Sequence, residues 1–141
     1  MKLVRSLAHV CILTADLGRC EAFYCGILGL PKQFDFRRGE ELIGFYLKTG
    51  DRQFIEVFRR ESAPLERGNG ITHFCLEVDS VAEVVTVLHR RGVECREAKL
   101  GADQSWQTWC KDPDGIDIEF HEYTPASRQL AAPGGICEVN W

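Results

Sequence analysis

Hydrophobic and polar residues alternate with a period of two in the stretch LAHVCILT near the start of the chain. This alternation is typical of a β-strand, with Val10 and Ile12 on one face and His9 and Cys11 on the other. Asp16 then precedes apolar residues at helical spacing, which predicts a capped helix that ends at a glycine. The stretches KQFDF, LIGFYLK and RQFIEVF predict three further strands. The first half therefore has the order βαβββ.

The second half of the chain repeats this pattern. The stretch ITHFCLEV predicts a strand with His73 near its centre. Ser80 and Glu83 form a capping box before a helix that we expect to end at Gly92. The stretches ECREA, SWQTWC and IDIEFHE predict three strands, and the turn sequence DPDG joins the last two into a hairpin.

Matching residues of the two halves are separated by a nearly constant distance along the chain. The separations are 64 residues for His9 and His73, 63 for Gly29 and Gly92, and 63 for Glu56 and Glu119. Such a duplication predicts two modules related by a pseudo-twofold axis. We expect an α+β fold in a single domain of residues 1–141, with one βαβββ module in 1–66, a second in 67–123 and a surface tail in 124–141.

The most informative chemical groups are a histidine on the first strand and a glutamate on the last strand of each module. The pattern places His9, Glu56, His73 and Glu119 on the face opposite the one that a helix covers. One such residue alone is more often structural, but four in symmetric positions favour a shared metal site. Two imidazoles and two carboxylates suit Zn²⁺, Ni²⁺, Co²⁺, Mn²⁺ or Fe²⁺. Without a cation, two converging glutamates would repel and desolvate each other, which would destabilise the fold by roughly several kcal/mol.

Composition, charge and cysteine spacing limit the classes of protein to which the chain can belong. With 141 residues and 45% of them hydrophobic, the chain is expected to form one compact domain with a core. The formal charge of -4 and the scattered Lys and Arg residues argue against nucleic acid as a partner. The seven cysteines include no Cys-x-x-Cys pair, which fits neither a disulfide framework nor a zinc ribbon. With no apolar run long enough for a membrane span, we expect a soluble, cytoplasmic protein.

Three stretches resemble the vicinal oxygen chelate superfamily: HVCILTADLGRCEAFYCGILGL, HFCLEVDSVAEVVTVLHRRGVE and KDPDGIDIEF. The His, Glu, His, Glu order of the candidate ligands is similar to that of its glyoxalase I branch, and the resemblance covers residues 3–123. It implies paired βαβββ modules whose strands curl into a cup around one divalent metal ion per site. It also implies a homodimer and a small-molecule substrate with two neighbouring oxygen atoms.

The same resemblance implies an activity. A metal-dependent lyase or isomerase of this kind acts through an enediolate that the ion stabilises. By analogy Glu119 and Glu56 are the catalytic residues, Glu119 as the base that takes the substrate proton and Glu56 mainly as a ligand. The alternatives are an epimerase, an extradiol dioxygenase, and a non-catalytic protein of the same fold that binds a small molecule or antibiotic.

One departure from the family bears on the substrate. Glutathione-using bacterial relatives typically have an arginine four residues after the first histidine, where this chain has Leu13. They also typically have an asparagine shortly after the strand of the first glutamate, where this chain reads FRRESAPLERGNG. We therefore predict the metal chemistry. The substrate, and whether it contains glutathione, stays open.

Overall fold

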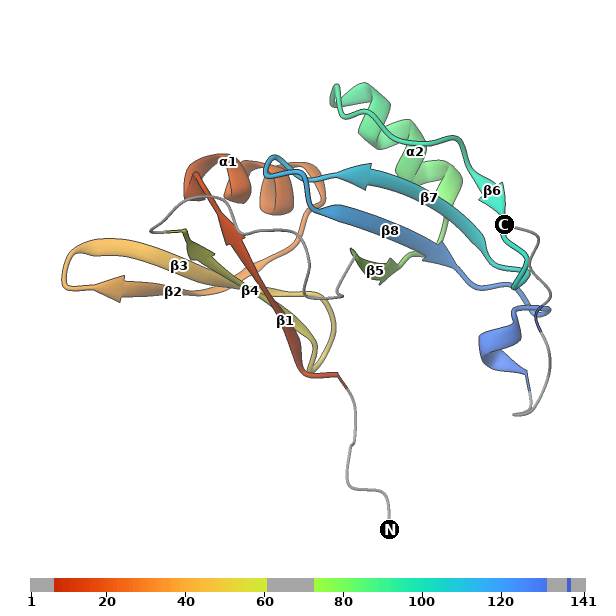
Figure 1. The fold of residues 1–141 in the computed structure, drawn as a ribbon, viewed down its shortest axis with the longest axis horizontal. Coiled ribbons are helices and arrows are strands. Elements are labelled where there is room, and N and C mark those ends of the chain that lie inside the picture. Colours follow the sequence, from red (N-terminus) through yellow and green to blue (C-terminus); the bar gives the residue numbers. More distant parts are fainter. Residues whose placement is uncertain (1–6, 61–72, 132–136, 138–141) are drawn as a thin grey trace, which may run out of the picture. The chain divides into compact units, whose positions relative to one another are not determined.

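The structure is a computed structural model that describes residues 7–60, 73–131 and 137. The chain divides into two compact units, Met1–Ile71 and Thr72–Trp141. Each unit has a helical segment and a four-stranded mixed sheet in the order βαβββ (Figure 1). The predicted α+β fold with two such modules is confirmed, while the closing of the sheets into a cup stays a prediction. In the described part of the chain, no helix has the length and apolar character needed to cross a bilayer.

Unit 1 contains one open sheet with the strand order β1-β4-β3-β2. β1 runs parallel to β4, and β3 pairs antiparallel with both β4 and β2. Its elements are β1 (His9–Thr14), α1 (Leu17–Glu21), the π-helix η1 (Ala22–Ile27), β2 (Lys32–Arg38), β3 (Glu41–Lys48) and β4 (Phe54–Arg59).

The helical segment of unit 1 begins as predicted but does not stay an α-helix. Asp16 caps it, because its Oδ1 accepts a hydrogen bond of 3.0 Å from the backbone N–H of Arg19. After Glu21 the segment widens into η1, a π-helix. The wider turn buries the neighbouring Phe23 and Tyr24 together, with their rings edge to face at 5.1 Å. The spacing of apolar residues alone did not predict this change of helix type.

The core of unit 1 lies between this helical segment and one face of the sheet. Ile55 and Val57 on β4 and Phe45 and Leu47 on β3 are almost fully buried there. Glu56 lies between two of these buried residues along β4 and therefore points to the opposite, open face. The period-two prediction for this strand is confirmed.

Unit 2 repeats the arrangement with the strand order β5-β8-β7-β6, β5 parallel to β8. Ser80 caps α2, since its Oγ accepts a hydrogen bond of 3.2 Å from the N–H of Glu83. The helix ends before Gly92, which has a φ of 74°. The elements are β5 (His73–Glu77), α2 (Val81–Arg90), β6 (Lys99–Leu100), β7 (Trp106–Lys111), β8 (Asp117–Glu122) and the 3-10 helix η2 (Arg128–Leu130).

The prediction of a strand in the stretch ECREA is wrong. Only Cys95 in that stretch makes an isolated bridge, to Cys110, and the strand beside β7 is the two-residue β6. In this stretch the Thr108 hydroxyl donates a hydrogen bond to the carbonyl of Arg96, so a side chain occupies a carbonyl that a regular ladder would pair with backbone.

The predicted hairpin between β7 and β8 is confirmed. Oδ1 of Asp112 accepts hydrogen bonds of 2.9 Å from the backbone N–H groups of Asp114 and Ile116, and Gly115 has a φ of 82°. This turn fixes the register of β8, and with it the position of Glu119 opposite Trp109. Of the predicted tail, residues 132–136 and 138–141 lie outside the described residues.

Candidate functional site

In unit 1, the first strand and the last strand bring a histidine next to a glutamate. His9 is the first residue of β1, and Glu56 lies at the centre of the parallel neighbour β4. Nε2 of His9 lies 3.8 Å from Oε2 of Glu56, and the two side chains are 42% and 22% exposed. Both remain accessible on the open face of the sheet.

Unit 2 has the same pair in the same place. His73 is the first residue of β5, and Glu119 lies at the centre of β8. Nε2 of His73 lies 3.5 Å from Oε2 of Glu119, with exposed fractions of 35% and 13%. The structure thus joins each predicted histidine to the predicted glutamate of its own unit. The assembly of both pairs around one ion stays a prediction.

The atoms of each pair fit two neighbouring ligands of a divalent ion. Imidazole nitrogen and carboxylate oxygen bind such ions at about 2.1 Å, so two ligands at right angles lie about 3 Å apart. The observed separations of 3.8 Å and 3.5 Å need only small side-chain adjustments to reach this geometry.

Each glutamate also has a cysteine opposite it on the parallel strand. Cys11 faces Glu56, and burial followed by hydrogen bonding to Glu56 raises the pKa of its thiol to about 11. Cys75 faces Glu119, and burial followed by the charge of Glu119 raises its pKa to about 12. Both thiols are therefore neutral at physiological pH.

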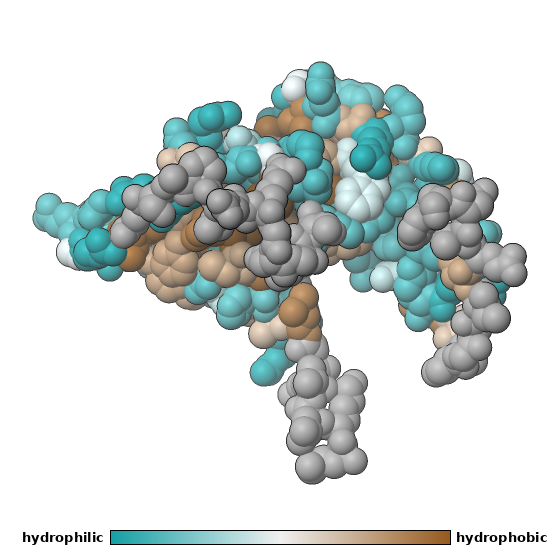
Figure 2. Space-filling model, viewed as in Figure 1, coloured by the Kyte–Doolittle hydropathy of each residue, from teal (hydrophilic) through white to brown (hydrophobic). Residues whose placement is uncertain are grey.

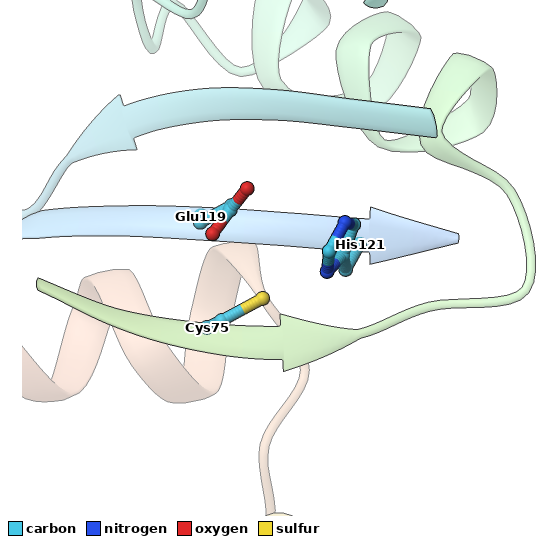
Figure 3. A group of neighbouring side chains, drawn as sticks. All are labelled: Cys75, Glu119 and His121. Atoms are coloured by element: carbon cyan, nitrogen blue, oxygen red, sulfur yellow. The ribbon is translucent and has the colours of Figure 1, made fainter. Parts of the chain in front are cut away.

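A second group of ligand-type side chains surrounds Glu119 in unit 2. Figure 3 shows Cys75 on β5 with Glu119 and His121 on β8, and one ligand atom of each lies within 4.8 Å of the others. The equivalent of His121 in unit 1, 63 residues earlier, is Phe58, so this group is not repeated. It marks a difference between the two units.

Asp103 holds His121 in place. Oδ2 of Asp103 lies 3.3 Å from Nε2 of His121 and also accepts a hydrogen bond from the Gln129 amide. Burial works against the charge of Asp103, but hydrogen bonds from Gln129 and Ser105 and the nearby imidazole hold its pKa below the usual value. The turn sequence around Asp103 carries no periodic signal, so sequence reasoning missed this contact.

Comparisons with known proteins agree on one family. The sequence matches the model of the Glyoxalase/Bleomycin resistance protein/Dioxygenase superfamily over residues 6–120. The lactoylglutathione lyase of Salmonella typhimurium is 26% identical over 131 residues, covering 88% of this chain and 97% of that protein.

Solved structures show the same likeness. A glyoxalase family protein from Enterococcus faecalis has a TM-score of 0.73 at 25% identity, covering 86% of this chain and 100% of that one. TnmS3, an antibiotic binding protein from Streptomyces sp. CB03234, has a TM-score of 0.72 at 17% identity, covering 88% and 100%, which shows the fold alone. These matches confirm the resemblance inferred from the sequence.

Proposed function

The chain belongs to the Glyoxalase/Bleomycin resistance protein/Dioxygenase superfamily, and on that basis we propose that it is a metal-dependent lyase or isomerase. Its substrate is a small molecule with two neighbouring oxygen atoms, and its metal is Ni²⁺, Zn²⁺, Co²⁺, Mn²⁺ or Fe²⁺.

The observation that carries the proposal is the repetition of the histidine–glutamate pair. The same two strands in each unit hold the pair at 3.8 Å and at 3.5 Å. We propose that His9, Glu56, His73 and Glu119 together bind one ion. The group of Cys75, Glu119 and His121 is a weaker candidate for the ligand set, because unit 1 has no counterpart of His121.

The two glutamates have different roles in this proposal. The bound ion would supply Lewis acidity at the oxygen atoms of the substrate. Glu119 takes the proton from the carbon next to the carbonyl and returns it to the neighbouring carbon, while Glu56 serves mainly as a ligand. The lower exposure of Glu119, 13% against 22%, supports this choice, because less water competes with the substrate for its carboxylate.

A non-catalytic binding protein is the second candidate, favoured by the fold likeness to TnmS3. Such a protein needs a ligand surface but no bound metal. An epimerase is a related enzymatic alternative, and an extradiol dioxygenase would leave Glu56 outside the ligand set. Metal content separates the binding protein from the enzymes at the first step.

Metal analysis of the purified protein tests the proposal. Chelator-stripped protein loaded with each ion in turn is expected to hold about one ion per chain and to melt at a higher temperature when loaded. His9→Ala and His73→Ala should each weaken binding, while His89→Ala, exposed on α2, should not. Absence of bound metal under every loading would overturn the proposal.

Cobalt also identifies the ligand atoms. With nitrogen and oxygen ligands only, the Co²⁺-loaded protein should show no sulfur-to-metal charge-transfer absorption. Such a band, lost in Cys75→Ser, would show instead that Cys75 is a ligand and that the proposed set is wrong.

We also propose a homodimer. β1 and β5 each have one strand neighbour among the described residues, and such open edges are commonly covered by pairing. Light scattering should give the mass of two chains. Mixing His9→Ala protein with His73→Ala protein then shows whether the four ligands of one site come from one chain or from two. Activity returns in mixed dimers only if each site takes the His9–Glu56 pair from one chain and the His73–Glu119 pair from the other.

A further inference from the structure

The open face of the unit 1 sheet carries aromatic residues as well as His9 and Glu56. Residues directly opposite each other on antiparallel strands share a face. Tyr46 lies opposite Glu56, and Phe34 lies opposite Tyr46. The remaining aromatic residues of this face are Phe36, Phe54 and Phe58.

The rings form one continuous surface. Phe34 stacks on Tyr46 with ring centres 4.9 Å apart and planes 14° apart, and Phe36 stacks on Phe58 at 4.6 Å. Gly44 makes this second stack possible, because a Cβ there would lie 2.7 Å from Cδ1 of Phe58. We call these five rings, of Phe34, Phe36, Tyr46, Phe54 and Phe58, the aromatic face.

The aromatic face reaches the proposed metal ligands. The Tyr46 ring lies 5.8 Å from the His9 ring in an edge-on arrangement, and it lies 5.2 Å from Phe54. Glu56 stands between Phe54 and Phe58 along β4. A molecule bound at this histidine and glutamate therefore has aromatic rings as its immediate neighbours.

These rings are not needed for the core. The core of unit 1 lies on the other side of the sheet, where Phe45 and Leu47 are fully buried. On the open face, Phe34 is 46% exposed and the other four aromatic residues are half-buried. Figure 2 shows hydrophobic residues gathered over β2 and β3 in this view. Exposed rings beside a candidate site are more useful for binding than for folding.

Unit 2 provides the comparison, because only one of its five equivalent positions is aromatic. Trp109 takes the place of Tyr46, and its ring lies 4.6 Å from the His73 ring. The other four positions, 63 residues after Phe34, Phe36, Phe54 and Phe58, are the polar Glu97, Lys99, Asp117 and His121. If the fold alone required aromatic residues at these four positions, both units would carry them.

We propose that the substrate carries a planar aromatic or conjugated ring next to its two chelating oxygen atoms, and that Phe34 and Tyr46 bind this ring. The proposal rests on the proposed function, which supplies the chelation at His9 and Glu56. Stacking against Phe34 and Tyr46 then discriminates ring-bearing substrates from small aliphatic ones.

Three hydroxamates test the proposal, because they present the same two chelating oxygen atoms and differ only in the attached group. The probes are acetohydroxamate, cyclohexanecarbohydroxamate and benzohydroxamate, added to the Co²⁺-loaded protein. Calorimetry gives each dissociation constant, and the change in cobalt absorption shows that the ion is chelated. We expect benzohydroxamate to bind roughly tenfold to a hundredfold more tightly than acetohydroxamate, after correction for their affinities for free Co²⁺.

Substitutions show which residues cause the preference for benzohydroxamate. Phe34→Leu and Tyr46→Leu keep an apolar side chain but remove the ring, so each should reduce the preference for benzohydroxamate over acetohydroxamate several-fold. Trp106→Leu is the matched control, since Trp106 is 39% exposed but lies on the face of its own sheet away from Glu119. Melting curves show whether each variant is folded, and Phe34, the most exposed of the five, is the safest site for substitution.

The outcomes are distinct. Equal binding of acetohydroxamate and benzohydroxamate overturns the inference but leaves the metal site and the proposed function intact. Equal binding of the cyclohexyl and phenyl probes also overturns it, because the site then selects apolar size and not a ring. Failure of all three to reach the metal overturns both proposals. A dimer that dissociates in Phe34→Leu would show that a second copy covers the aromatic face, against the proposal.

Discussion

The backbone N–H of Val81, the first residue of α2, donates a hydrogen bond of 2.8 Å to Oε2 of Glu122, the last residue of β8. The contact links positions 41 residues apart. It ties the start of the helix to the strand that carries Glu119, and the negative carboxylate also interacts favourably with the positive end of the helix dipole.

Removing either cap of α2 should destabilise the protein. Ser80→Ala loses the hydrogen bond to Glu83, and Glu122→Ala leaves the Val81 N–H without its carboxylate partner. We expect each to lower the free energy of unfolding by about 1 kcal/mol. Urea unfolding followed by circular dichroism measures this. Thr86→Ala, in the exposed middle of the same helix, is the control and should cause no loss.

The raised pKa of the Cys75 thiol predicts slow alkylation. At pH 8, a thiol with a pKa of about 12 has about a thousandfold less thiolate than one with the ordinary value of 9.0. Iodoacetamide should therefore modify Cys75 far more slowly than free glutathione, with a rate that keeps rising with pH beyond 9. Glu119→Gln removes a negative charge, lowers the pKa and should speed the reaction. Mass spectrometry of peptides gives the rates, and a wild-type rate equal to that of glutathione would contradict this account.

Glu119 and Glu56 should differ in their effects on turnover. An amide oxygen can still coordinate a metal but cannot accept a proton, so Glu119→Gln should lower kcat roughly 100-fold to 10,000-fold while keeping much of the metal. Glu56→Gln should have a milder effect on kcat. Elemental analysis alongside steady-state kinetics separates the two roles. Equal activity of Glu119→Gln and wild type would show that another group is the base.

Much of the fold could be predicted because the signals are periodic. Alternation on the two strands flanking each site, the caps at Asp16 and Ser80 and the DPDG turn are all local, and the structure has them. The π-helix η1 was missed because the spacing of apolar residues predicts a helix but does not specify which backbone groups bond to each other. The ECREA stretch was misassigned because a side chain, that of Thr108, takes one of its carbonyls, which alternation does not reveal.

The candidate site was only partly predictable for a similar reason. Each histidine–glutamate pair follows from period two and from the repeat, since both members come from strands with clear alternation. Asp103 lies in a turn, and its contact with His121 depends on tertiary structure that the sequence does not encode locally. The aromatic face was missed because aromatic residues in strands usually indicate core, and only strand pairing shows that Phe34 and Tyr46 lie on the open side.

The hemithioacetal of methylglyoxal and glutathione should be a poor substrate. Leu13 takes the place of the arginine that the resemblance implies, on the same face of β1 as His9, and is half-buried opposite Phe58. Glutathione brings two carboxylates, and an apolar neighbour leaves one of them without a partner, which weakens binding. We expect kcat/KM below about 10⁴ M⁻¹s⁻¹ for the metal-loaded protein. Leu13→Arg should lower KM for this substrate, while Leu13→Met, the matched control, should not. Efficient turnover by the wild type would show that other residues hold the peptide, and it would leave the assigned metal chemistry in place.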